Sequence, residues 1–185
     1  MKKTLRLAVL ILAIVPVISC CWRPTLTEPE WETYTSEDAG FSILVPGEVE
    51  ESSELMATDA GMVEMFYFSV DKSYGAFMVS YNYLPFAEDI ELSASDIEHF
   101  FDESRNGSLQ YLPEGKLVYE KKISLDGHPG REFQLKGKNG ELDAQYTSRI
   151  YLVDGVRYYQ VAVASTPTGV TEENLSKFLE SFEVK

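Results

Sequence analysis

The sequence predicts an α+β protein in which an antiparallel β-sheet is flanked by helices. Several runs of five to a dozen residues are rich in β-branched and aromatic side chains, as strands are. Three Asp-Gly or Asn-Gly dipeptides separate the later runs and are typical of tight hairpins. Two further segments repeat apolar residues at helical spacing, which predicts helices that cover the sheet.

The first half of the chain contains three predicted strands. Residues 41–45 run into the turn Pro46-Gly47, and residues 62–70 and 76–84 are joined by the loop 71–75. The alternation of Phe77, Val79, Tyr81 and Tyr83 predicts one buried face for the third strand.

A helix is predicted over residues 95–105. Ser95 and Glu98 have the spacing of a capping box, and Ile97, Phe100 and Phe101 recur at helical spacing. The dipeptide Asn106-Gly107 then predicts the end of the helix.

The second half predicts an antiparallel meander followed by a last helix. Its strands are residues 116–125, 130–136, 142–153 and 158–164, joined at Asp126-Gly127, Asn139-Gly140 and Asp154-Gly155. Thr171 is the predicted cap of the last helix, whose apolar face is Leu175, Phe178, Leu179 and Phe182.

Five short segments of this chain resemble the PsbP/Mog1-like superfamily and related bacterial lipoproteins. They are Gly40-Phe-Ser-Ile-Leu-Val-Pro46, Gly127-His-Pro-Gly-Arg-Glu-Phe133, Arg149-Ile-Tyr-Leu-Val153, Tyr158-Tyr-Gln-Val161 and Phe178-Leu-Glu-Ser-Phe182. The resemblance implies an α/β/α sandwich, and binding or assembly work rather than catalysis. No residue here matches the metal contacts of PsbP, so the photosynthetic role is not transferred.

The N-terminus has the pattern of a secretory leader over residues 1–19. Lys2, Lys3 and Arg6 precede an apolar run over residues 7–18, which is shorter than the ~20 residues of a transmembrane helix. Val17-Ile18-Ser19-Cys20 resembles the bacterial lipobox, whose cysteine receives diacylglycerol. The alternative is ordinary signal-peptidase cleavage with incidental thiols.

Lipidation of Cys20 would hold the mature chain on the extracytoplasmic face of a bacterial membrane. Together, diacylglycerol and an N-linked fatty acid such as palmitate anchor durably, because each buried methylene contributes about 0.8 kcal/mol. Residues 20–30 contain Pro24 and Pro29 and predict a short tether to a single domain at residues 31–185. The predicted location is therefore the cell envelope.

The charge balance argues against nucleic acid as a partner. The formal net charge is −14, and loss of the three cations of the leader lowers it to −17. Such a surface repels phosphates. The acidic run Glu48, Glu50, Glu51 and Glu54 is explained by a solvated face, with cation buffering as an alternative.

No catalytic, metal-binding or cofactor-binding residues are predicted. His99 and His128 are the two histidines, and they occur outside any recognised metal or hydrolase motif. His99 falls on the predicted helix, and His128 lies in a turn beside Asp126.

The candidate partner surface consists of Tyr67, Arg131, Arg149, Arg157 and Tyr158. Neighbours alternate across a strand, so Tyr67 and Tyr158 are expected to point away from their aromatic neighbours and to face a partner. The alternatives are that the arginines pair with carboxylates across strands and that a second helix layer covers the tyrosines.

These observations lead to the hypothesis of a non-enzymatic, lipid-anchored accessory, binding or assembly factor with a protein partner in the envelope. The alternative is a solute-binding or hydrolytic lipoprotein with a pocket between the sheet and the helices.

Overall fold

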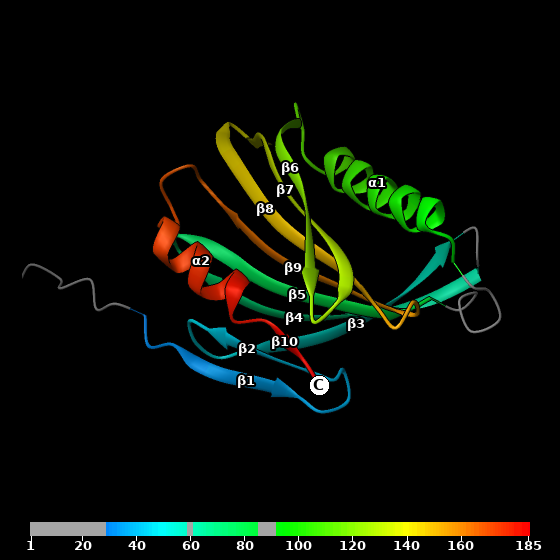
Figure 1. Ribbon diagram of the computed structural model, residues 1–185. Coiled ribbons are helices and arrows are strands. Elements are labelled where there is room, and N and C mark those ends of the chain that lie inside the picture. Colours follow the sequence, from blue (N-terminus) through cyan, green and yellow to red (C-terminus); the bar gives the residue numbers. More distant parts are fainter. Residues whose placement is uncertain (1–28, 59–60, 85–91) are drawn as a thin grey trace, which may run out of the picture.

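The computed structural model describes residues 29–58, 61–84 and 92–185 (Figure 1). The predicted leader and Cys20 lie outside the described residues, as does most of the predicted tether. The two helices are α1 (Ala94–Gln110) and α2 (Glu172–Glu180). The strands are β1 (Glu32–Ser36), β2 (Phe41–Val45), β3 (Glu50–Thr58), β4 (Gly61–Lys72), β5 (Gly75–Tyr83), β6 (Lys116–Leu125), β7 (His128–Asn139), β8 (Leu142–Val153), β9 (Arg157–Ser165) and β10 (Glu183–Val184).

Seven strands form one antiparallel sheet in the order β3-β4-β5-β9-β8-β7-β6. The pairing of β5 with β9, from Gly75 opposite Ser165 to Tyr83 opposite Arg157, joins the early hairpins to the later meander. A second antiparallel sheet has the order β1-β2-β10. The antiparallel sheet with flanking helices confirms the predicted fold class.

One face of the large sheet packs against α2 and the small sheet. Phe77 of β5 meets Phe178 of α2 edge to face, with ring centroids 5.2 Å apart. Phe41 of β2 meets Phe68 of β4 in the same geometry at 5.1 Å. Together with Tyr159 of β9, these rings belong to the larger hydrophobic core.

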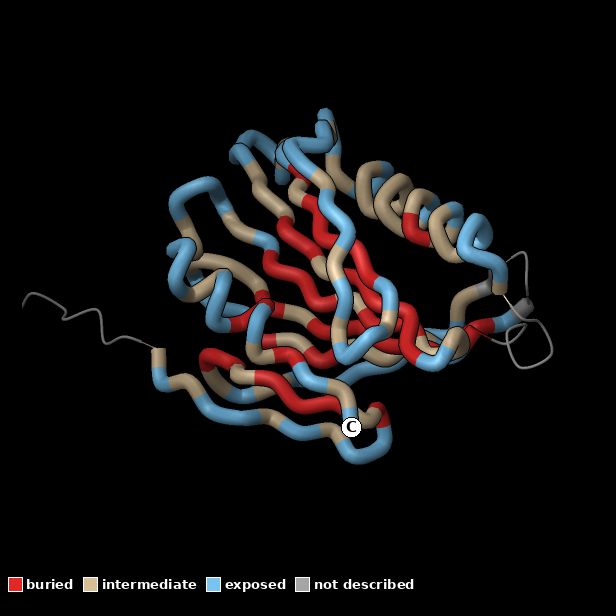
Figure 2. The backbone as a smooth tube through the Cα atoms, in the orientation of Figure 1, coloured by how far each residue is buried: buried red, intermediate tan, exposed pale blue. Residues whose placement is uncertain are grey.

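The other face of the large sheet carries α1. Phe101 of this helix is buried with Phe133 of β7, Ile150 of β8 and Tyr158 of β9 in a second, smaller core. Figure 2 shows the buried residues concentrated in the strands between these flanking layers. Helices therefore lie on both faces of the sheet. This arrangement agrees with the alternative from the sequence analysis in which a second helix layer covers the tyrosines.

The hairpin turns follow the predicted dipeptides. Asp126 and Asp154 have φ values of 49° and 53°, and the glycines that follow them also have positive φ. Positive φ at both central residues is the signature of the type I′ turn, which matches the twist of antiparallel strands. At the third dipeptide the turn is shifted by one residue, because Asn139 pairs with Leu142 across the hairpin.

The boundaries of α1 correct the sequence prediction at both ends. The cap is Ser93, whose hydroxyl accepts from the Asp96 backbone, while the Asp96 side chain accepts from the Ser93 N–H. The helix also continues through Gly107 to Gln110. Glycine costs a helix interior only about 1 kcal/mol, and the packing of Leu109 and Leu112 against the second core favours continuation.

Strands β1 and β3 were not predicted from the sequence. The acidic run that indicated a solvated face is the start of β3, an edge strand whose Glu50 pairs with Ser69 of β4. An edge strand in water tolerates charged side chains, so its composition resembles that of a loop. Tyr83 was predicted to be buried, but it is 53% exposed at the end of β5.

Candidate functional site

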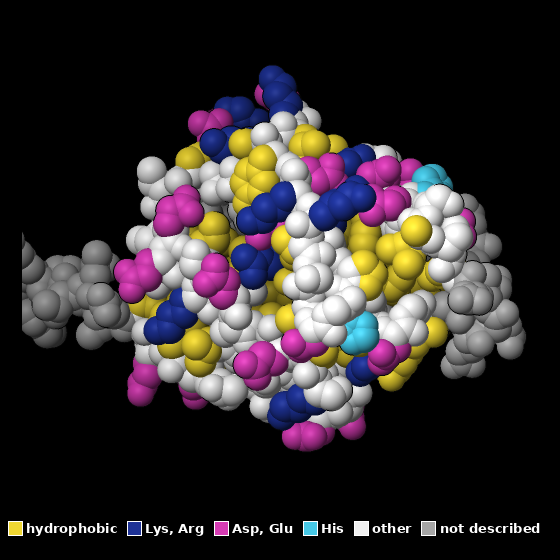
Figure 3. All heavy atoms as spheres, viewed as in Figure 1, with side chains coloured by type: hydrophobic (Ala, Val, Ile, Leu, Met, Phe, Trp, Pro, Cys, Tyr) yellow, Lys and Arg dark blue, Asp and Glu magenta, His cyan; other side chains and the backbone are white. Residues whose placement is uncertain are grey.

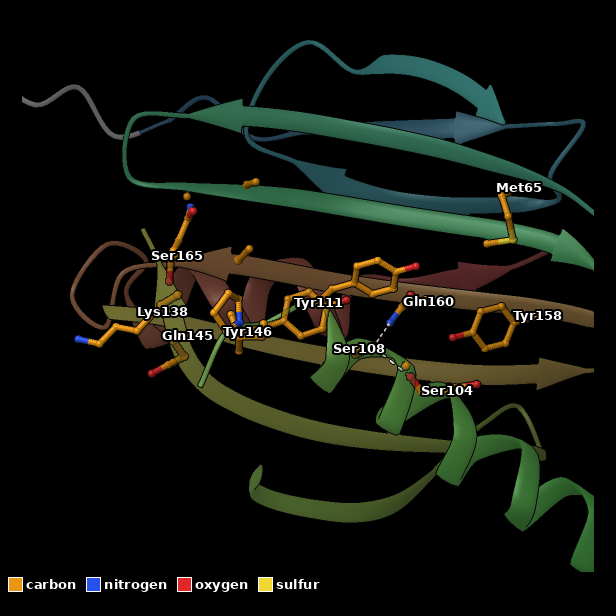
Figure 4. Close-up of a pocket in the computed structure, with 18 of the residues that line it drawn as sticks. Met65, Ser104, Ser108, Tyr111, Lys138, Gln145, Tyr146, Tyr158, Gln160 and Ser165 are labelled. Atoms are coloured by element: carbon orange, nitrogen blue, oxygen red, sulfur yellow. Dashed lines mark hydrogen bonds between the residues drawn. The ribbon is translucent and has the colours of Figure 1, made fainter. Parts of the chain in front are cut away.

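A large groove lies between α1 and the half of the sheet made by β4, β5 and β9 (Figure 4). Its volume is about 1810 Å³, which exceeds the roughly 300–1,000 Å³ of ordinary small-molecule pockets. We call it the α1 groove. It is defined by Met65 of β4, Phe100, Ser104 and Ser108 of α1, and Tyr158 and Gln160 of β9.

The groove exists because α1 uses two adjacent faces for different purposes. Phe100, Ser104 and Ser108 recur every four residues and form one face, which lines the groove. Phe101 and Asp102 lie on the next face around the helix, which packs onto β7. The helix is therefore held over one half of the sheet and leaves the other half uncovered by α1.

Arg131 of β7 is the main polar contact between α1 and the sheet. Its guanidinium pairs with Asp102 and Glu98 of α1 and with Glu120 of β6 at 2.9 Å, and it stacks over the Phe101 ring at 5.6 Å. The side chain is only 6% exposed, whereas Asp102 is 47% exposed. Figure 3 shows basic and acidic side chains side by side along α1 and the adjoining β6.

This ion-pair cluster favours the charged form of its two α1 carboxylates, Asp102 and Glu98. The hydrogen bond from Arg131 lowers the pKa of Asp102 below its ordinary value. The hydrogen bond from Lys122 Nζ, 2.7 Å from Glu98 Oε1, lowers the pKa of Glu98 in the same way. The wall of the groove is therefore fixed by charge pairing, while the charges face β6 and β7.

The helix side of the groove carries neutral hydroxyl and amide groups. Ser104 Oγ donates to Phe100 O at 2.9 Å, and Ser108 Oγ donates to Ser104 O at 3.1 Å. From the sheet, Gln160 Nε2 donates to Ser148 Oγ at 3.2 Å and approaches Ser108 Oγ at 3.5 Å (Figure 4). We call Ser104, Ser108 and Gln160 the polar track.

Two phenols complete the neutral lining. Burial raises the pKa of Tyr146 on β8 to about 12. Burial also raises the pKa of Tyr158, which lies in the second core below α1. Both side chains therefore stay uncharged near neutral pH and serve as hydrogen-bonding groups.

The end of the groove nearest β3 and β4 is apolar. It is lined by Met56 of β3, Val63 and Met65 of β4, and Leu84 and Leu92 beyond β5. Methionine side chains adapt to differently shaped apolar ligands. This end suits a chain-like apolar group.

Charged side chains that line the groove lie on turns, hairpin tips and the exposed side of α1. Asp96, His99 and Glu103 are exposed positions of α1, and Asp71 is an exposed position next to the β4–β5 turn. Of the two lysines in the lining, Lys138 pairs with Asp143 at 2.7 Å across the β7–β8 hairpin, and Lys72 Nζ lies beside Gly47. The rim is therefore predominantly acidic.

The structure does not bring the five residues of the predicted partner surface together. Arg131 and Tyr158 are 5% and 8% exposed and lie under α1. Tyr67 is half-buried, and its hydroxyl lies 3.9 Å from Met56 Sδ on the same face. Arg149 and Arg157 lie on the opposite face, so the five residues form no common surface.

The two remaining arginines have structural partners. Arg149 Nε donates to Glu132 Oε2 at 2.6 Å, and its Nη1 donates to Leu179 O at the end of α2 at 3.0 Å. Arg157 pairs with Asp154 at 2.8 Å. Arg131, Arg149 and Arg157 therefore all pair with carboxylates, as the alternative interpretation of the sequence predicts.

The polar track was missed in the sequence analysis. Ser104 and Ser108 are separated by four residues, which places them on one helix face, but serine pairs at this spacing are common on exposed helices. Gln160 occurs within a strand whose other residues indicate a buried core. Only the position of α1 over β9 makes them neighbours.

In the three described ranges, no group of three or more His, Cys, Asp and Glu side chains is arranged to hold a metal ion. Neither α1 nor α2 has both the length and the apolar composition that a membrane-crossing helix needs.

The fold and the groove define an α+β protein with a PsbP-like fold. A matching solved structure is that of cyanobacterial PsbP (CyanoP) from Synechocystis sp. PCC 6803, at a TM-score of 0.53 and 16% identity, covering 92% of this chain and 100% of that one. A protein of unknown function, PA94, from Pseudomonas aeruginosa has a TM-score of 0.39 and 11% identity, with coverages of 75% and 85%. In sequence, no family model and no curated protein matches the chain.

Proposed function

We propose that this chain is a non-enzymatic accessory protein of the bacterial envelope that binds an amphiphilic molecule in the α1 groove. The proposal has two parts, an anchor at Cys20 and a binding site under α1. The observation that carries it is the groove itself, which combines an apolar end with a neutral polar track.

The chemistry of the polar track favours binding over catalysis. The hydroxyls of Ser104 and Ser108 are both engaged as donors to carbonyls of their own helix. An attacking serine instead needs a general base as its hydrogen-bond partner. These side chains therefore act as acceptors for a bound molecule.

The size of the groove favours an elongated occupant. Its lining includes β5 at Gly75 and Ala76 and again at Asn82, and the span from Gly75 to Asn82 is about 23 Å at a rise of about 3.3 Å per residue. A tether of about ten residues would keep the domain within roughly 35 Å of the membrane. The groove would then be close to a source of amphiphilic molecules.

A groove-filling variant tests the binding site. A Cβ added to Gly107 meets no atom within 4 Å, so Gly107→Leu places a larger side chain in the groove without a backbone clash. Gln110→Leu adds the same side chain at an exposed position of the same helix and is the control. The binding site is the part of the proposal under test.

The measurement is the fluorescence of N-phenyl-1-naphthylamine, an uncharged apolar dye, with the predicted mature chain (residues 20–185) carrying Cys20→Ala, which lacks both the lipid and the apolar run of residues 7–18. We expect Gly107→Leu to weaken dye binding at least tenfold, and Gln110→Leu to leave it unchanged. Equal dye binding by both variants would show that the groove is not the site.

The anchor is tested separately in cells. Cys20→Ala should remove a lipid-sized increment from the intact mass of the protein and leave residues 1–19 attached, whereas Cys21→Ala should do neither. An unmodified Cys20 in the wild-type chain would disprove lipid anchoring and leave the groove proposal standing.

A further inference from the structure

We infer that the natural ligand of the α1 groove is an uncharged amphiphile with a hydroxyl- or amide-bearing head group and an apolar chain. The inference rests on the proposed function and adds the chemical class of the ligand. It follows from the hydrogen-bonding capacity of the polar track, the charge of the rim and the position of the apolar end.

The polar track is a set of acceptors. Ser104 Oγ uses its only hydrogen to bond to Phe100 O, and Ser108 Oγ uses its hydrogen to bond to Ser104 O. Gln160 donates through Nε2 to Ser148, which leaves Oε1 to accept. A ligand that satisfies these atoms must carry hydrogen-bond donors, as sugar hydroxyls and amide N–H groups do.

The phenols of Tyr146 and Tyr158 belong to the same hydrogen-bonding network, since Ser104 is the partner of Tyr158 and Ser108 and Ser148 are partners of Tyr146. Burial raises the pKa of both groups, so each retains its hydrogen near neutral pH. A hydroxyl group on the ligand can donate to Ser104 and accept from a phenol, because a hydroxyl is both donor and acceptor. An alkylammonium or a carboxylate offers only one of these roles.

The charge distribution disfavours an anionic head group. Asp71, Asp96 and Glu103 stand at the rim, where Lys138 is already paired with Asp143 and the other lysine of the lining, Lys72, has its Nζ beside Gly47. The whole chain has a formal net charge of −14, which adds long-range repulsion. A cation would find the acids only at the exposed rim, where solvent and salt screen the attraction.

The apolar end of the groove requires a ligand that carries an apolar chain. Met56, Val63, Met65 and Leu84 lie beyond the polar track, at the β3–β4 end of the groove. Burial of apolar area is the dominant favourable contribution to association, so an alkyl or isoprenyl chain there supplies most of the affinity. The head group then supplies the selectivity.

A set of probes with the same chain tests this inference. Dodecyl maltoside, dodecanoate and dodecyltrimethylammonium each have an unbranched chain of twelve carbons, counting the carboxylate carbon of dodecanoate. Their head groups are neutral, anionic and cationic, respectively. Each is titrated below its micelle concentration against N-phenyl-1-naphthylamine bound to the predicted mature chain (residues 20–185) with Cys20→Ala, and circular dichroism verifies the fold at each concentration. Maltose is the head group without a chain.

We expect dodecyl maltoside to displace the dye at a concentration at least tenfold below that of either charged probe, and maltose to displace none. Ser104→Ala, a substitution that favours the helix, should raise the dodecyl maltoside concentration that displaces the dye three- to tenfold. The displacing concentrations of the two charged probes should not change. Gln160→Leu should also raise the dodecyl maltoside concentration that displaces the dye.

The outcomes separate the two levels of the proposal. Displacement by a charged probe at an equal or lower concentration overturns the neutral class but retains the groove as a binding site. Dye binding that is insensitive to every probe and to Gly107→Leu overturns the proposed function itself.

Discussion

Arg131 of β7 and Asp102 of α1 form an ion pair that fixes one face of the helix to the sheet, while the adjacent face lines the α1 groove. The guanidinium also reaches Glu98 one helical turn earlier and Glu120 on β6. The position of the groove wall therefore depends on a buried arginine that does not itself line the groove.

Replacing Arg131 by Met should destabilise the protein by about 2–3 kcal/mol. Breaking a wholly buried pair costs about 3–5 kcal/mol, and the value here is lower because the carboxylates are partly exposed to water. Urea unfolding followed by circular dichroism measures the change. Lys136→Met, at an exposed position of the same strand, is the control and should change little.

Gly107→Ala should stabilise the protein by about 1 kcal/mol. The glycine lies inside α1, and an added Cβ meets no atom within 4 Å, so the gain in helix propensity is realised in full. Gly130→Ala is the contrast, because its Cβ would lie 2.5 Å from the Tyr151 ring. Thermal unfolding should shift upward for the first variant and downward for the second.

The ion pairs make stability depend on pH in acid. Burial raises the pKa of Glu132, but hydrogen bonds from Lys121, Arg149 and Tyr119 outweigh this effect and place the pKa below its ordinary 4.5. The pKa of Asp102 also lies below its ordinary 3.8. A carboxyl with a lowered pKa stabilises the fold above its ordinary value, and this contribution is lost as the pH falls through the lowered one.

We therefore expect the free energy of unfolding to decline as the pH drops below about 4.5, with unfolding curves recorded from pH 7 to pH 2. Glu132→Gln should be less stable at pH 7 and less sensitive to acid. An unchanged slope in this variant would show that Glu132 does not contribute to the pH dependence.

Ionisation of Tyr146 lowers the stability of the protein as the pH rises in alkali, which is the opposite sign to the carboxylates. Its pKa is raised from 10.0 to about 12, so its contribution is complete below pH 10 and is lost as the pH rises toward 12. Ultraviolet titration should show Tyr146 among the tyrosines that ionise last. Tyr146→Phe should remove one phenol from that late transition, and loss from the early transition would contradict the burial of this side chain.

The sequence predicts the later meander better than the early part of the chain. Asp126-Gly127 and Asp154-Gly155 locate their turns because their backbone conformation is a local property of these residues. The edge strand β3 could not be predicted in this way, since its acidic side chains serve equally well in a solvated loop. The end of α1 was missed because tertiary contacts of Leu109 and Leu112 outweigh the local effect of Gly107.

The sequence alone determined the fold class, the turns at Asp126-Gly127 and Asp154-Gly155 and the cap of α2 at Thr171, because periodicity and turn chemistry act between near neighbours in the chain. Only the tertiary structure decided which face of α1 meets β7 and which lines the groove. Arg131 and Asp102 are 29 residues apart, and Gln160 and Ser108 are 52 residues apart. Contacts over such separations depend on how the whole sheet and its helices pack, which no local pattern encodes.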